Sequence, residues 1–234
     1  MIKIERAEVF GWEAAIRGMR NPLNSWDKSD TKYYDGCGVF RIPKVGSNDL
    51  KLMKSLSKAG SDHAKFLRYI NVTVDITAPL YWWKEFKTYR NGRKFLDTEP
   101  DIVSCDYLEF DIEMNSCSTM HKIHAKEFEL DDFSHEHLLP GGMVALRDVI
   151  GTLNTAREEY LKTKDKQFWW QMIQLLPSSY NQKRTVQLNY QVLKSMYFAR
   201  RNHKLDEWVD FCKWVETLPY FKEIVIQDEK GGAE

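Results

Sequence analysis

The chain has 234 residues, and its 34 Lys and Arg balance its 34 Asp and Glu, so the formal net charge is zero. This length suits one large domain or two small ones. With 43% hydrophobic residues the chain can bury a core, which excludes intrinsic disorder. The net charge of zero argues against a protein that binds duplex nucleic acid, because such domains are usually basic overall. A small anionic ligand needs only a few local cations, so a net charge of zero is compatible with binding one.

The chain carries no signal for export or membrane insertion. No apolar run approaches the roughly 18 residues that span a bilayer, and charges occupy residues 1–6, where a signal peptide needs apolar side chains. The cysteines are widely spaced and form no CxxC pair: Cys37, Cys105, Cys117 and Cys212. We therefore expect reduced thiols in a cytoplasmic protein without a membrane partner.

The first part of the chain mixes predicted strands and helices. Alternation, turn residues and β-branched runs predict, in order, a strand over 2–10, a helix over 13–19, a loop over 21–46, a helix over 48–59 ended by Gly60, a strand over 71–77 and an aromatic helix over 80–89 opened by Pro79. Residues 91–113 are rich in acid, and hydropathy alternates from Tyr107 to Met114, which predicts a half-exposed strand.

From residue 141 the pattern is helical. Apolar spacing predicts one long helix around Leu146 and Leu153 and a second over 168–175. Ser179 and Gln182 resemble a capping box for a third helix reaching about residue 201. A fourth starts near Asp206, with Trp208, Phe211, Cys212 and Val215 inward. No segment resembles a linker, so we predict a single α/β domain over 1–234 with a helical C-terminal half.

Two groups of residues could bear chemistry near the middle of the chain. Residues 115–121 hold three hydroxyls, a thiol and an imidazole, but no nucleophile signature. A polar ligand-binding loop is favoured over a catalytic dyad. Cys117, His121, His124, His135 and His137 could in principle bind zinc in a hydrolase, but their spacing is generic, so we predict no metal site.

A third candidate is Arg200. Asn189, Leu193, Met196 and Arg200 share one face of a helix. Burying an arginine without an anion costs several kcal/mol. Arg200 therefore either points into a cleft or lies along the surface and pairs with an acid such as Asp206 or Glu207.

Together these segments resemble the flavin-dependent thymidylate synthases. That family runs a strand into A-P, an R-Q-x-x-R-H-R helix end, N-E-x-S-x-R-Y, and later L-P, N-x-R and L-R. The matching segments here are Val74 to Pro79, Lys84-Glu85, Thr88-Tyr89-Arg90, Asn115 to His121, Leu176-Pro177, Asn189-Tyr190-Gln191 and Ala199-Arg200. Residues 92–113 then look like an acidic insertion.

The resemblance implies an α+β fold with a central, mostly antiparallel sheet, in a homotetramer. It implies reductive methylation of deoxyuridylate (dUMP) with FAD, NADPH and methylene-tetrahydrofolate. Arg200 would be catalytic, holding the pyrimidine and favouring its ionised form. The implied substrate-binding residues are Ser118, Glu85, Ser116, Cys117 and Thr119, and the implied flavin-binding residues are Arg90, Tyr89, Asn189, Gln191 and Ser195.

Several family residues are replaced. Arginine is missing at Met120, Gln191, Thr88 and Ile173, and Ser116 stands in place of a glutamate. Because arginine binds phosphate through bidentate, charge-assisted bonds, dUMP binding should weaken unless Lys87, Lys122 or Arg184 takes over. The alternative is a non-catalytic nucleotide- or flavin-binding homologue. Nearby rings could stack on flavin or pyrimidine, or be plain core: Tyr81, Trp82, Trp83, Phe86 and Tyr89.

Overall fold

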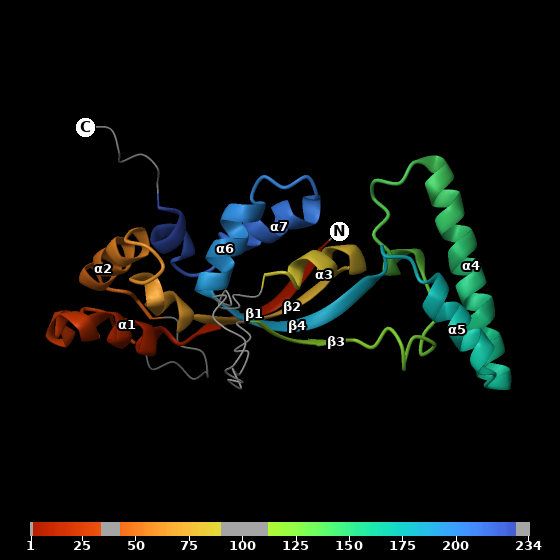
Figure 1. The fold of residues 1–234 in the computed structure, drawn as a ribbon, viewed down its shortest axis with the longest axis horizontal. Helices are drawn as coiled ribbons and strands as arrows, with labels where there is room; N and C mark the ends of the chain where they lie inside the picture. Colours follow the sequence, from red (N-terminus) through yellow and green to blue (C-terminus); the bar gives the residue numbers. More distant parts are fainter. Residues whose placement is uncertain (1, 34–42, 90–111, 228–234) are drawn as a thin grey trace, which may run out of the picture. The chain divides into compact units, whose positions relative to one another are not determined.

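The computed structural model describes residues 2–33, 43–89 and 112–227 (Figure 1). Its strands and longer helices are β1 (Lys3–Phe10), α1 (Trp12–Arg20), α2 (Ser47–Lys58), β2 (Asn71–Pro79), α3 (Leu80–Phe86), β3 (Ile112–Ser116), α4 (Pro140–Thr163), α5 (Lys166–Leu175), β4 (Asn181–Asn189), α6 (Tyr190–Arg200) and α7 (Asp206–Val215). Shorter helical turns include η3 (Ala64–Arg68) and η5 (Lys222–Ile226). No helix among the described residues is long and apolar enough to cross a bilayer.

The strands in the described part of the chain form one four-stranded antiparallel sheet in the order β1-β2-β4-β3. Two backbone bonds show how β2 and β4 run against each other. The N–H of Tyr190 donates to the carbonyl of Ile70 at 2.9 Å, and the N–H of Leu80 donates to the carbonyl of Tyr180 at 3.0 Å. The expected α+β class with a mostly antiparallel sheet is confirmed.

The chain divides into two compact units, which we describe separately. Unit 1 comprises Met1–Ile4, Asp75–Thr88 and Asn115–Thr185, and unit 2 comprises Glu5–Val74, Tyr89–Met114 and Val186–Glu234. The expectation of a single domain stays a prediction, as does the acidic insertion, because residues 90–111 lie outside the described residues.

Unit 1 has a core beneath the hairpin of α4 and α5, which pack against each other (Figure 1). The buried cluster joins three separate segments and consists of Ile123, Phe128, Phe133, Leu146, Leu153, Ala156 and Met172. The helical periodicity predicted the inward positions of Leu146 and Leu153 correctly, whereas Leu175, in the second predicted helix, is exposed. Asn154 adds a polar tie, because its side-chain oxygen accepts from the N–H of Phe128 at 2.8 Å and its amide nitrogen donates to the same residue's carbonyl at 2.9 Å.

Unit 2 is organised around a buried carboxylate at the start of α2. Asp49 accepts from Arg20 Nε at 2.7 Å and from the hydroxyls of Ser29 and Thr31 at 2.8 and 2.6 Å. Burial alone would raise the pKa of Asp49, but hydrogen bonds from Thr31, Ser29 and Arg20 lower it below its ordinary value. Ser29 and Thr31 are therefore fixed to α2 by hydrogen bonds to a carboxylate rather than by apolar packing.

Close packing of Asp30 requires glycine at position 46. The carboxylate of Asp30 accepts from the N–H groups of Asn48 and Asp49 at 2.9 and 3.1 Å, so it caps α2 from a distant part of the chain. A Cβ on Gly46 would lie 2.2 Å from that carboxylate and 2.4 Å from the Asp30 carbonyl. Only a residue without a side chain fits here.

One predicted helix is wrong at its start. The segment Asn181–Asn189 is strand β4, and the helix begins only at Tyr190. Along β4, inward positions alternate with more exposed ones, but two of the inward residues are Gln182 and Arg184. Polar side chains at buried positions conceal the period of two, and the apparent capping box of Ser179 and Gln182 does not form.

The remaining expected elements agree with the structure to within a few residues where it describes them. Helix α3 ends at Phe86 rather than at residue 89. In α7 the four predicted inward side chains are buried: Trp208, Phe211, Cys212 and Val215.

Candidate functional site

The polar segment after β3 forms a tight turn, which we call the 116–121 loop. The hydroxyl oxygen of Ser118 accepts from the N–H of Met120 at 3.2 Å and from the N–H of His121 at 2.9 Å. The hydroxyl hydrogen is not used in these bonds, so Ser118 can donate it to an anionic oxygen. Ser116, Cys117 and Ser118 are exposed, and Thr119 is half-buried. The loop thus presents small polar groups to solvent.

Three bonds from other elements of unit 1 fix this loop. The N–H of Cys117 donates to the carbonyl of Lys183 at 3.0 Å, and Gln182 Nε2 donates to the Cys117 carbonyl at 2.5 Å. From α5, Trp169 Nε1 donates to the Met120 carbonyl at 3.0 Å. The polar loop is consequently held by both β4 and α5.

Gln182 links this loop to a buried cation. Arg184 Nε and Nη2 both donate to Gln182 Oε1, at 3.0 and 2.7 Å, and the guanidinium lies 4.4 Å from the centre of the Trp83 ring. Burial lowers the pKa of Arg184 to about 10, so it stays charged at neutral pH. Arg184 is only 6% exposed. It therefore organises the interior rather than replacing a missing phosphate-binding arginine.

The structure does not arrange the loop as a nucleophile with its base. Within the described chain, no hydrogen bond joins the His121 ring to the thiol of Cys117 or to a loop hydroxyl. The described residues also hold no group of three or more His, Cys, Asp or Glu that could bind a metal ion. Glu85 lies on α3, half-buried, and its carbonyl accepts from the Thr88 hydroxyl at 2.7 Å.

In unit 2, Arg200 lies between two aromatic rings, and we call this group the Arg200 cluster. Its Nε donates to the hydroxyl of Tyr89 at 2.5 Å. The guanidinium carbon lies 5.3 Å from the Tyr89 ring centre and 5.1 Å from that of Trp208. The two rings meet edge to face at 5.7 Å. Cation–π contact with both rings holds a half-exposed positive charge in a defined position at the end of α6.

The other expected flavin-binding residues of unit 2 lie at the beginning of α6. Asn189 is its N-cap, and its buried side-chain oxygen accepts from the N–H of Val192 at 3.0 Å. Gln191 and Ser195 are half-buried, and the Ser195 hydroxyl donates to the Gln191 carbonyl at 3.2 Å. Arg90, the remaining flavin-binding candidate, lies outside the described residues.

Most of the aromatic residues suggested for stacking belong to the core. Trp82, Trp83 and Phe86 are essentially fully buried and pack on one another with ring centres 4.9–5.2 Å apart. They are not available to a ligand, so of the two alternatives the structure supports the core for these three rings. Tyr81 and Tyr89 are half-buried. Sequence reasoning missed Gln182 and Trp169 as anchors of the 116–121 loop and Trp208 as a partner of Arg200.

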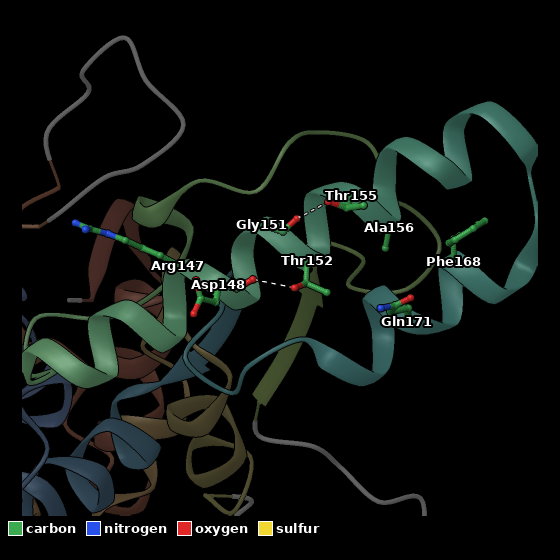
Figure 2. Close-up of a pocket in the computed structure, with 8 residues that line it drawn as sticks. All are labelled: Arg147, Asp148, Gly151, Thr152, Thr155, Ala156, Phe168 and Gln171. Carbon is green, nitrogen blue, oxygen red and sulfur yellow. Dashed lines mark hydrogen bonds between the residues drawn. The ribbon is translucent and has the colours of Figure 1, made fainter.

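A hollow of about 500 Å³ on the α4–α5 hairpin contains none of the expected site residues. Figure 2 shows Thr152 and Thr155 turned back onto the backbone of α4, where their hydroxyls donate to the carbonyls of Asp148 and Gly151 at 2.9 and 3.0 Å. These two hydroxyls therefore bond to carbonyls of their own helix. The residues that the sequence singled out lie elsewhere, in the 116–121 loop and the Arg200 cluster.

Comparison with known proteins shows a shared fold. No protein-family model and no curated protein matches the chain. Among solved structures it is similar to thymidylate synthase X from Helicobacter pylori with FAD and dUMP, with a TM-score of 0.62 and 16% identity over 97% of this chain and 98% of that one. A second structure, the flavin-dependent thymidylate synthase from Helicobacter pylori complexed with FAD and dUMP, gives a TM-score of 0.61 at the same identity and coverage.

Proposed function

We propose that this protein is a divergent flavin-dependent thymidylate synthase that reductively methylates a pyrimidine nucleotide, dUMP or a close variant. Support comes from the fold, which is similar over nearly its full length to proteins crystallised with FAD and dUMP. The observation that supports the chemical part of the proposal is the Arg200 cluster, in which Tyr89 and Trp208 hold the half-exposed guanidinium of the residue that the resemblance assigns as catalytic.

In this proposal Arg200 acts on the pyrimidine ring. A guanidinium beside a ring nitrogen favours the ionised ring, which makes the ring carbon more nucleophilic without a nucleophile from the protein. The Tyr89 hydroxyl and the Trp208 ring orient the guanidinium for this role. In unit 1, the proposal assigns substrate binding to Ser118, whose hydroxyl hydrogen can be donated, and to Ser116, Cys117, Thr119 and Glu85.

The residues near the start of α6 fit a flavin. The half-buried Gln191 amide can donate to and accept from the polar edge of a flavin ring, while Ser195 and the ring of Tyr89 offer a hydroxyl and an aromatic surface. Asn189 would contact the flavin through its amide nitrogen, since its oxygen caps the helix. FAD would supply hydride transfer, with NADPH and methylene-tetrahydrofolate as co-substrates. We further propose a cytoplasmic homotetramer.

A second candidate is a nucleotide- or flavin-binding protein without turnover. It is favoured by the exposed Met120 in the 116–121 loop, where the family has a phosphate-binding arginine, and by the burial of Arg184, which removes one possible replacement. Both candidates bind the same small molecules and differ in catalysis.

Tritium release from the 5-position of dUMP, in the presence of FAD, NADPH and methylene-tetrahydrofolate, separates the two. The synthase proposal predicts release that falls about 10²-fold or more in Arg200→Gln. The matched control is Arg201→Gln, because Arg201 is an exposed neighbour whose guanidinium lies 5.3 Å from the Phe198 ring centre. Nucleotide binding without tritium release supports the second candidate. Equal release by both variants would contradict the role of Arg200.

A further inference from the structure

Three cations of unit 1 lie near one histidine that follows the 116–121 loop, and we call them the 122/157/164 cluster. Lys122 follows the loop, Arg157 lies on α4, and Lys164 is the residue at which α4 ends. The histidine is His124, which the expected function does not use. The positive charges of all three cations act on its imidazole.

The cluster is held by contacts between the chain after the loop and α4. Arg157 Nε donates to the carbonyl of His124 at 3.1 Å. The His124 ring meets the Tyr160 ring edge to face at 4.9 Å, and Lys164 Nζ lies 5.6 Å from the centre of that ring. Lys164 adopts a left-handed backbone, with φ 58°, which ends the helix there. These contacts hold Arg157 on the His124 backbone and Lys164 beside the ring that packs on His124, and Lys122 lies two residues before His124 in the chain.

No described carboxylate neutralises the cluster. Lys122, Arg157 and Lys164 form no ion pair with any residue that the structure describes, whereas nearby Lys126 and Lys162 are paired with Asp132 and Glu159. The carboxylate of Asp165, next to Lys164, accepts from the N–H of Gln167 at 2.9 Å and caps α5. The three positive charges near His124 thus have no ion-pair partner in the described chain.

His124 itself stays neutral in this field. Burial lowers its pKa, and the charges of Lys122, Lys164 and Arg157 lower it further. Its Nδ1 atom is buried and has no hydrogen-bond partner among the described residues, so a second proton there would be poorly solvated. An anion bound to the cluster would offset the three positive charges and raise the pKa of His124. The pKa of this histidine therefore reports on anion binding.

We propose that Lys122, Arg157 and Lys164 form a binding site for a phosphate group. The Nη1 and Nη2 groups of Arg157 make no hydrogen bond to a described residue, and their planar arrangement suits two phosphate oxygens. Lys122 and Lys164 are exposed and would add two point charges. Inorganic phosphate and the phosphate of a nucleotide present the same chemistry to such a site. The proposal is independent of flavin chemistry; if the ligand is the nucleotide, the site supplies cations that the 116–121 loop lacks at Met120.

The test compares two double variants that remove the same charge. Lys122→Met/Lys164→Met removes cations of the cluster, and the control Lys162→Met/Lys213→Met removes two exposed lysines that are ion-paired elsewhere. Inorganic phosphate is titrated into each protein in a phosphate-free buffer, and the His124 imidazole is followed by NMR. We expect saturable binding that raises the pKa of His124 in wild type and control, and affinity about tenfold or more weaker in the cluster variant.

Parallel titrations with dUMP and with deoxyuridine identify the source of the phosphate. If the site holds the nucleotide, dUMP shifts His124, deoxyuridine does not, and inorganic phosphate competes with dUMP. If it holds a separate phosphate, dUMP and phosphate bind together. Equal phosphate affinity in the two double variants, or no saturable binding by the wild-type protein, overturns the proposal. FAD binding, measured in the same samples, reports separately on the proposed function.

Discussion

The Gln182 side chain bonds both to the buried Arg184 and to the 116–121 loop, and two substitutions test these two interactions. Its side-chain oxygen accepts from the buried Arg184 guanidinium at 3.0 and 2.7 Å, and its nitrogen donates to the Cys117 carbonyl at 2.5 Å. Hydrogen bonds to charged groups contribute roughly 1.5–3 kcal/mol each. Gln182→Met removes both bonds from Arg184 and should lower the free energy of unfolding by about 3 kcal/mol, at the low end of that range.

Gln182→Glu keeps an acceptor for Arg184 but removes the donor to Cys117. Because a buried ion pair roughly breaks even with the interaction it replaces, we expect the free energy of unfolding to stay within about 1 kcal/mol of wild type. The substitution, however, removes one hydrogen bond that anchors the 116–121 loop and places a carboxylate oxygen against the Cys117 carbonyl. Its amides should therefore exchange faster with solvent.

Urea denaturation measures the first effect, and hydrogen–deuterium exchange of a peptide covering 117–121 measures the second. Gln187→Glu is the matched control, because Gln187 is an exposed residue of the same strand. The reasoning is refuted if Gln182→Met unfolds with wild-type stability, or if exchange in the loop is unchanged in both Gln182 variants.

Three further changes test other parts of the structure. Asp49→Asn should cost about 3–5 kcal/mol at pH 7, because it leaves a buried guanidinium uncompensated. Because folding lowers the pKa of Asp49, the loss of stability in Asp49→Asn is complete above the unfolded pKa of 3.8 and shrinks as the pH falls below that value. Urea denaturation of both proteins across this pH range checks the prediction, and a stability difference that does not change with pH would contradict it. Gly46→Ala brings a methyl against Asp30 and should cost more than about 1 kcal/mol; an unchanged Tm would contradict this. Burial raises the pKa of Cys212 to about 12, so a thiol reagent should modify the exposed Cys117 before Cys212, as mass spectrometry of the two peptides would check.

The elements with regular hydropathy were predictable from the sequence. Strand β2 carries β-branched residues at alternating positions, and α7 places Trp208 and Phe211 at helical spacing. Strand β4 could not be recognised in this way, because Gln182 and Arg184 occupy inward positions. Their burial is stabilised by partners on α3 and in the 116–121 loop, which lie far away in sequence.

The candidate site was predictable in its residue types but not in its contacts. Composition pointed to the 116–121 loop, and the family resemblance pointed to Arg200 and Tyr89. The bond between those two residues joins positions 111 apart, so only the fold brings them together. Gln182 and Trp169 carry no signal in the sequence as anchors of the 116–121 loop, because each holds the loop through one bond to a backbone carbonyl.

The central claim is that this chain binds FAD, and the stoichiometry of FAD per chain tests it most directly. Purified protein, as isolated or after incubation with FAD and removal of the excess, should absorb near roughly 450 nm, as flavins do. We predict retention of close to one FAD per chain in wild type and in Arg201→Gln. Colourless protein that retains no added FAD would contradict the account.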